Sequence, residues 1–352
     1  MPPLLFQLAA KKDLSTEQAT ELFHFLIDPH TMDGERVAIL AALRDKGETP
    51  TEVAAFAQAM RAAAIDPGIV HVAHAGTILD VVGTGGDGGN TINISTAAAL
   101  LAAATTKGIV KVVKHGNRAI SSKSGASDVL TALGIPAALG PDAARALLAR
   151  TGFTYLHAPH YHASVAAVAN ARKTLGTRSI FNLLGPLTNP AKPTHALIGA
   201  YSPAAANLIA HAAKDLGYRT VMVVHTPTGP TTGLDEATTA LAFNEWRMSS
   251  GRVTTGTGCA VNHRFEPGTL QDISGRDPAY NAQVIRDIFN GVKHVAADTI
   301  LLNTGLALMS CGWSGDVSAC ARMAQAAITD GRAANLLNEL ESFGREHPSN
   351  AA

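Results

Sequence analysis

A glycine-rich stretch is the strongest chemical signal in this chain. Residues 83–89 read GTGGDGG and directly follow the apolar, β-branched run at residues 77–82. Glycines let backbone N–H groups approach an anion closely, because no Cβ atom stands in the way. A helix that begins near Asn93 would add free N–H groups and the positive end of its dipole. We therefore predict a phosphate site here, with the Ser95 and Thr96 hydroxyls as further donors or as metal ligands.

A second polar stretch gathers cations and hydroxyls after the next apolar run. Residues 114–125 read KHGNRAISSKSG. Charge-assisted hydrogen bonds are about twice as strong as neutral ones, so Lys114 and the Ser121 and Ser122 pair suit a diphosphate or a sugar phosphate. The alternative is a solvated basic turn without a ligand.

Two adjacent carboxylates, Asp235 and Glu236, follow the apolar run that ends at His225. Magnesium usually takes one or two protein carboxylates together with phosphate oxygens and water. The pair is therefore a candidate metal site opposite the glycine-rich stretch. The alternative is an acidic pair that only stabilises the start of a helix, and both roles are compatible.

The glycine spacing also matches a dinucleotide-binding fingerprint, Gly83-x-Gly85-x-x-Gly88. No acidic residue lies about twenty positions further on to bind a ribose, and Asp87 would repel a pyrophosphate unless a cation lay between them. A P-loop is excluded because no Lys-Ser/Thr pair follows the glycines. A glycine turn without any ligand remains the other alternative.

The elements that must position these residues begin with helices. Ser15-x-x-Gln18 and Thr49-Pro50-Thr51-Glu52 are both typical of capping boxes, and Gly47 can end the helix between them. Three helices are expected in residues 1–75, which we interpret as an all-helical domain.

From residue 76 the pattern changes to short β-branched runs alternating with helical stretches. Strands are expected at residues 77–82, 109–113, 197–200 and 220–224, with helices at 142–150 and 204–216 among others. This alternation predicts an α/β domain over residues 76–352, with a mainly parallel central sheet flanked by helices. Residues 163–190 read as helices and are expected to pack on the N-terminal domain.

Composition excludes several classes of function. The chain has 352 residues, with 28 Lys and Arg against 28 Asp and Glu, so it has no basic surface for nucleic acid or for an anionic membrane. Three cysteines without a Cys-x-x-Cys pair favour a reducing cytoplasm. We expect neither a signal peptide nor a membrane span.

Taken in order, these motifs resemble the anthranilate phosphoribosyltransferases of tryptophan biosynthesis over nearly the whole chain. The resemblance rests on the helical opening, on the glycine-rich stretch with NIST at 93–96, and on KHGNR at 114–118 with the serine pair. It also includes Arg172, FNLLGPLTNP at 181–190 and the acidic pair. It implies transfer of phosphoribose from 5-phosphoribosyl-1-diphosphate to the amine of anthranilate, giving N-(5-phosphoribosyl)anthranilate and diphosphate in the second step from chorismate.

The resemblance also implies a homodimer formed through the helical part, a cleft between the domains, and magnesium, with two ions expected. Ser95 would bind one ion and Asp235 with Glu236 the other. Gly83, Asn117 and Arg172 would bind anthranilate. The diphosphate substrate would be bound by Gly83, Gly86, Asp87, Thr91, Asn93, Ile94, Ser95, Thr96, Lys114, His115, Gly116, Asn117, Arg118, Ala119, Ile120, Ser121, Ser122 and Ala126.

The chain departs from the family pattern in a few places. Residues 105–107 look like a short insertion, residues 226–232 form a longer approach to Asp235, and Ala126 and Ala163 replace commoner residues. None of these removes a residue assigned to chemistry. Two alternatives share the architecture: a pyrimidine-nucleoside phosphorylase, and a catalytically silent relative that binds phosphorylated ligands.

Overall fold

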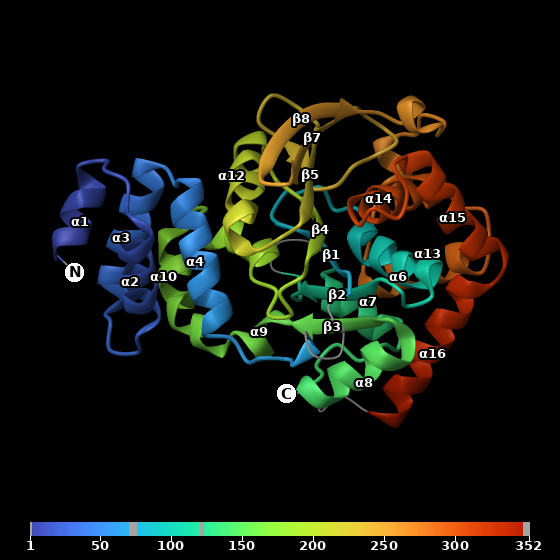
Figure 1. Cartoon of the computed structure of the whole chain (residues 1–352), viewed down its shortest axis with the longest axis horizontal. Coiled ribbons are helices and arrows are strands. Elements are labelled where there is room, and N and C mark those ends of the chain that lie inside the picture. Colours follow the sequence, from blue (N-terminus) through green and yellow to red (C-terminus); the bar gives the residue numbers. More distant parts are fainter. Residues whose placement is uncertain (1, 70–75, 120–122, 348–352) are drawn as a thin grey trace.

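A computed structural model describes residues 2–69, 76–119 and 123–347 of the chain (Figure 1). Four N-terminal helices form one end of the molecule, on the left of Figure 1, and the sheet with its flanking helices forms the rest. This is a small helical part beside a larger α/β part, which confirms the predicted fold class. The predicted boundary at residues 75 and 76 adjoins residues 70–75, which lie outside the described ranges, and it stays a prediction.

The N-terminal helices begin where the capping signals predict. The Ser15 side chain accepts from the Gln18 N–H at the start of α2, and the Thr49 side chain accepts from the Glu52 N–H at the start of α4. Gly47 ends α3 with a positive φ of 88°. One helix, α1, was not predicted, because no capping residue precedes it. The bounds are α1 (Pro2–Ala9), α2 (Thr16–Ile27), α3 (Asp33–Lys46) and α4 (Pro50–Ala62).

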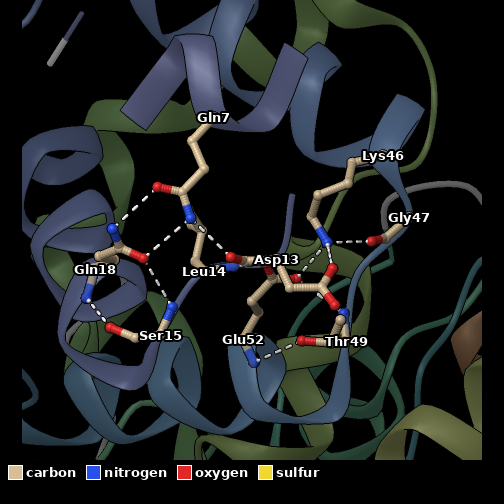
Figure 2. A network of polar contacts seen from close by, with 9 residues as sticks. All are labelled: Gln7, Asp13, Leu14, Ser15, Gln18, Lys46, Gly47, Thr49 and Glu52. Atoms are coloured by element: carbon tan, nitrogen blue, oxygen red, sulfur yellow. Dashed lines mark hydrogen bonds and ion pairs between the residues drawn. The ribbon is translucent and has the colours of Figure 1, made fainter. Parts of the chain in front are cut away.

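A polar network joins these helices around the buried carboxylate of Glu52 (Figure 2). Glu52 Oε1 accepts from the Leu14 N–H at 2.9 Å, and Oε2 lies 3.0 Å from Lys46 Nζ. Lys46 Nζ also contacts Asp13 Oδ1 at 2.9 Å. A buried ion pair is retained only where further hydrogen bonds satisfy it. The α1–α2 connection is therefore held in one position against the start of α4.

The central sheet has the order β3-β2-β1-β4-β5-β7-β8, and β6 pairs with β5. The first five of these strands are mutually parallel, and β7 and β8 add an antiparallel edge. The four predicted strands correspond to β1, β2, β4 and β5, whereas β3, β6, β7 and β8 were not predicted. The bounds are β1 (Ile78–Gly83), β2 (Lys111–Gly116), β3 (Phe153–His157), β4 (His195–Gly199), β5 (Thr220–Pro227), β6 (Gly233–Leu234), β7 (Phe243–Ser249) and β8 (Arg252–Gly258).

The two faces of the sheet pack into two separate hydrophobic cores. Successive side chains of a strand point to opposite faces, so Val81 belongs to one core and Val82 to the other. Helices α6 and α14 pack on the first face, and α12 lies between the second face and α4. The helices of the α/β part are α6 (Ile94–Thr106), α7 (Ala126–Ala132), α8 (Pro141–Thr151), α9 (Ala158–Tyr161), α12 (Pro203–Ala213), α13 (Pro278–Phe289), α14 (Ala297–Ser310), α15 (Val317–Thr329) and α16 (Arg332–Glu346).

The segment at residues 163–190 is helical and contacts the N-terminal helices. It consists of η1 (Ala163–Val168), α10 (Ala169–Leu175), α11 (Phe181–Leu184) and η2 (Gly185–Leu187), where η marks a 3-10 helix. Helix α10 contacts α3, η1 contacts α2, and α11 contacts α4. This segment thus runs along the helical end of the molecule and returns to the sheet at Pro190.

Candidate active site

The ends of β1 and β4 form a flat seat for the acidic pair. Gly83 and Gly199 are partners in the parallel register and end these two strands. A Cβ atom on Gly83 would overlap the Asp235 carboxylate, and a Cβ atom on Gly199 would overlap the Asp235 main-chain carbonyl. The segment with Asp235 and Glu236 therefore packs directly against the main chain of Gly83 and Gly199 at the carboxyl edge of the sheet.

The acidic pair connects the glycine-rich stretch to the start of α6. Asp235 Oδ2 accepts from the Gly85 N–H at 2.7 Å, and Glu236 Oε1 accepts from the Ser95 N–H at 3.2 Å. The Asp235 N–H in turn donates to Asp87 Oδ2 at 3.3 Å. Elements 150 residues apart in the sequence thus converge as the motifs predicted.

Both acids of the pair are shielded from water, which changes their acidity. Burial, together with the nearby Asp87 carboxylate, raises the pKa of Asp235 to about 7. Burial and the neighbouring Asp235 also raise the pKa of Glu236 well above its usual range. Closely spaced anions in a buried site favour a cation between or beside them.

The free backbone donors of the glycine-rich stretch face no protein acceptor. The Gly85 N–H is used by Asp235, and the Gly89 N–H donates to Asp87 Oδ1 at 3.1 Å. Within the described ranges the N–H groups of Gly86, Asp87 and Gly88 form no hydrogen bond. Gly86 has a φ of 71°, a conformation that side-chain-bearing residues rarely adopt. Three unsatisfied donors on one exposed turn suit an anion.

Lys114 lies behind this turn rather than at the surface. Its side chain is buried, and its ammonium donates to the Val81 carbonyl and to Ser95 Oγ, the latter at 3.4 Å. Burial lowers the pKa of Lys114, and the carboxylates of Asp80, Glu236 and Asp235 oppose that shift. Lys114 is thus a buried cation among the site's acids, adjacent to the predicted ligand Ser95.

Asp80 is a further buried acid, and sequence reasoning missed it. Its side chain is fully buried, and burial raises its pKa to about 6, with the Lys114 charge acting in the opposite direction. Asn189 Nδ2 donates to Asp80 Oδ2 at 2.9 Å and to the Val113 carbonyl at 2.8 Å. Asn189 lies within the FNLLGPLTNP motif, so the sequence analysis included this residue but did not predict its contact with Asp80.

The loop after β2 is held by a carboxylate that was also missed, Asp128. Its Oδ2 accepts from the N–H groups of Ala119 and Gly125, each at 2.9 Å. Asn117 is exposed and its Oδ1 accepts from the Arg118 N–H at 2.7 Å. The predicted residues Ile120, Ser121 and Ser122 lie outside the described residues.

Several other residues that were predicted to bind the substrate have side chains that contact the protein instead. Ile94 and Thr96 are buried, so their side chains face the core. The Asn93 side chain is engaged by Ser124 and Asn281. Three further predicted residues have these contacts: Thr91 forms a β-bridge with Ser274, the buried His115 ring approaches the Gly185 carbonyl at 3.3 Å, and a Cβ atom on Gly116 would contact Tyr155 and Ala126.

Arg172, on α10, carries a half-buried guanidinium without a polar partner. Its Cζ atom lies 5.5 Å from the centre of the Phe181 ring, and burial lowers its pKa. Among residues 2–69, 76–119 and 123–347 it forms neither a hydrogen bond nor an ion pair, and none joins it to Gly83 or Asn117. Its donors are therefore available to a carboxylate.

Comparisons with known proteins agree with this geometry. The family model described as "Glycosyl transferase family, a/b domain" matches residues 75–334, and "Glycosyl transferase family, helical bundle domain" matches residues 2–64. An anthranilate phosphoribosyltransferase from Shewanella sp. (strain ANA-3) is 39% identical over 345 residues, covering 98% of this chain and 97% of the relative. The chain belongs to the anthranilate phosphoribosyltransferases.

Solved structures support the same assignment. The anthranilate phosphoribosyltransferase from Thermus thermophilus superposes with a TM-score of 0.85 at 32% identity, covering 97% of this chain and 99% of that one. The Saccharomyces cerevisiae anthranilate phosphoribosyltransferase, solved in complex with PRPP and Mg, has a TM-score of 0.83 at 25% identity and 97% coverage of each chain. The chain is thus an enzyme of the pentosyltransferase class.

The described part of this transferase contains no helix of the length and apolarity needed to cross a bilayer. It also contains no cluster of three or more His, Cys, Asp or Glu side chains arranged to hold a metal ion. The candidate metal ligands are therefore the carboxylates of Asp235 and Glu236 and the hydroxyl of Ser95. Such a small set suits a metal ion that also takes oxygen ligands from its substrate.

Proposed function

We propose that this transferase moves the phosphoribosyl group of 5-phosphoribosyl-1-diphosphate to the amine of anthranilate, releasing diphosphate. The observation that carries the proposal is the convergence of the acidic pair on the glycine-rich stretch and on the start of α6, through Gly85 and Ser95. An anion-binding turn and a pair of hard oxygen ligands are what a metal-bound diphosphate needs.

The leaving group would be held by the free N–H groups of Gly86, Asp87 and Gly88. As the C1–oxygen bond of the ribose breaks, negative charge grows on the departing diphosphate. Donors already aimed at that position stabilise the charge without reorganisation, and losing one of them typically costs about a hundred- to a thousandfold in rate. Lys114, held beside Ser95, adds a positive charge behind the same position.

Magnesium fits the residues present. Asp235 and Glu236 would hold one ion and Ser95 a second, because carboxylate and hydroxyl oxygens are hard ligands. Burial and mutual repulsion raise the pKa values of both acids, so a bound cation would be needed to favour their ionised forms. When bound, magnesium would offset the charge that develops on the diphosphate.

Anthranilate would be bound by Arg172 together with Gly83 and Asn117. The free guanidinium of Arg172 can form a two-pronged pair with the anthranilate carboxylate, which a lysine cannot reproduce. An aromatic amine is neutral at pH 7, so its lone pair needs orientation rather than deprotonation. Positioning of the two substrates therefore supplies most of the remaining acceleration, and no covalent nucleophile or general base is assigned.

We further propose a cytoplasmic homodimer that forms through the helical part. Phe6 on α1 and Met32 before α3 are 75% and 68% exposed, so the helical part offers large apolar side chains to a partner. Cys259, Cys311 and Cys320 are free, as expected of a reducing compartment. Sedimentation of the purified chain tests the dimer.

One assay tests the reaction. Purified protein is mixed with anthranilate, magnesium and 5-phosphoribosyl-1-diphosphate, and the loss of anthranilate fluorescence is followed. We expect turnover that needs all three components and releases one diphosphate per anthranilate consumed. A parallel mixture of thymidine and inorganic phosphate should show no phosphorolysis. Phosphorolysis in place of anthranilate consumption would establish the nucleoside phosphorylase alternative instead.

A further inference from the structure

An arginine outside the predicted site reaches the glycine-rich stretch from the helical side. Arg178 lies between α10 and α11, and its Nη2 donates to the Gly86 carbonyl at 2.7 Å. Its guanidinium carbon lies 4.0 Å from the centre of the Tyr201 ring. Such stacking over an aromatic ring restricts the orientation of a guanidinium.

Tyr201 is itself attached to the beginning of the same turn. Its N–H donates to Thr84 Oγ1 at 3.0 Å, and the Thr84 N–H donates to the Gly199 carbonyl at 2.9 Å. Arg178 therefore rests on a platform that does not move independently of the turn. On the opposite side the turn is held by Asp235, through the Gly85 N–H.

The bond to Gly86 also determines where the next donor points. The Gly86 carbonyl and the Asp87 N–H belong to one peptide unit, and this peptide is trans. In a trans peptide the C=O and the N–H point in opposite directions. With Arg178 bound to the carbonyl, the Asp87 N–H faces away from Arg178. It has no acceptor in the described part of the chain.

A charged donor on the carbonyl also strengthens the N–H of the same peptide, because hydrogen bonds in a chain polarise one another. We propose that Arg178 is a positioning residue, which holds the Gly86–Asp87 peptide with its N–H directed at the diphosphate of the substrate. This inference rests on the proposed function, in which the glycine-rich turn binds that diphosphate.

The test compares Arg178→Ala and Arg178→Lys with the wild type and with a matched control. Arg44→Ala is the control, because Arg44 is also exposed and its Nη1 donates to Thr177 Oγ1, one residue before Arg178, without reaching the turn. Binding of inorganic pyrophosphate with magnesium is measured by calorimetry, and KM is measured for each substrate. Thermal unfolding is recorded for every variant.

For Arg178→Ala we expect the pyrophosphate Kd and the KM for 5-phosphoribosyl-1-diphosphate to rise about tenfold, equal to ~1.4 kcal/mol. The KM for anthranilate, measured at saturating diphosphate substrate, should stay within twofold. Arg178→Lys should recover part of the loss, since it keeps the charge but not the stacked fork. Arg44→Ala should match the wild type in all three constants.

The outcomes separate this inference from the function on which it rests. If the wild type itself binds no pyrophosphate, the diphosphate role of the turn fails and the inference fails with it. If the wild type binds pyrophosphate and Arg178→Ala binds it equally well, only the inference is overturned. A variant that loses kcat and melting temperature while keeping both KM values would likewise show a merely structural role.

Discussion

Gly83→Ala is the substitution whose effect follows most directly from the structure. The added Cβ atom would lie 3.0 Å from the Asp235 carboxyl carbon and would overlap its Oδ2 atom. Since φ of Gly83 is not positive, an alanine fits the backbone there, so the loss is expected from this contact and not from backbone strain. The carboxylate must move, and it then loses the 2.7 Å bond from the Gly85 N–H.

The size of the loss follows from that one hydrogen bond. A hydrogen bond to a charged group contributes about 1.5–3 kcal/mol, which corresponds to roughly a 10- to 150-fold loss in kcat/KM for the diphosphate substrate. The magnesium concentration needed for half-maximal rate should rise in parallel, because the displaced carboxylate is a proposed ligand.

The assay is a steady-state titration of anthranilate consumption against magnesium and against 5-phosphoribosyl-1-diphosphate. Gly34→Ala is the control, since a Cβ atom at that exposed helical position meets nothing within 4 Å. It should leave both titrations unchanged. The reasoning is refuted if Gly83→Ala, shown to be folded by circular dichroism, keeps its kcat/KM and its magnesium requirement within threefold of the wild type.

Three further results are expected. Arg172→Ala should raise KM for anthranilate at least tenfold more than KM for the diphosphate substrate, and equal effects in steady-state kinetics would argue against a carboxylate contact. Asp235→Asn with Glu236→Gln should abolish the response of the rate to magnesium, and an unchanged titration would remove the metal assignment. His162→Asn should flatten the pH dependence of stability. Burial lowers the pKa of His162 from 6.5 to about 4, so the unfolded state binds the extra proton between these values. Stability therefore falls by ~2 kcal/mol from this group between pH 7 and pH 5, as urea unfolding at both pH values would measure, and an identical slope in the variant would contradict it.

Local signals in the sequence were sufficient for the capped helix starts at Ser15 and Thr49 and for strands β1, β2, β4 and β5. Ser15 and Thr49 cap their helices as predicted, because a capping box depends only on residues three positions apart. Strands β1 and β5 are rich in β-branched residues, which are readable without tertiary information. Strand β3 (FTYLH) is equally buried and parallel but carries only one β-branched residue, and it was missed. Strand β8 is mostly exposed and rich in Thr and Gly, so its sequence carries no comparable pattern.

The candidate site likewise contains residues that the sequence identifies and residues that only the fold identifies. The chemistry of the glycine-rich stretch and of the acidic pair can be inferred from the residue types alone, and the structure brings these two segments together. Arg178 and Asp80 act through main-chain or side-chain partners 92 and 109 positions away. No spacing rule links such residues to their partners, so only the folded chain identifies them. Lys114 was identified by type, but its burial beside Ser95 was not.

The seat formed by Gly83 and Gly199 has a consequence for how such chains diversify. Two neighbouring strands must both end without a side chain for the segment with Asp235 to lie on them. A descendant that abandoned the acidic doublet would no longer be constrained at either position, and alanine, serine or valine could enter both. We expect the glycine pair and the doublet to be gained and lost together across homologous chains, and an engineer transplanting the doublet into another parallel sheet would have to bring the two bare strand ends with it.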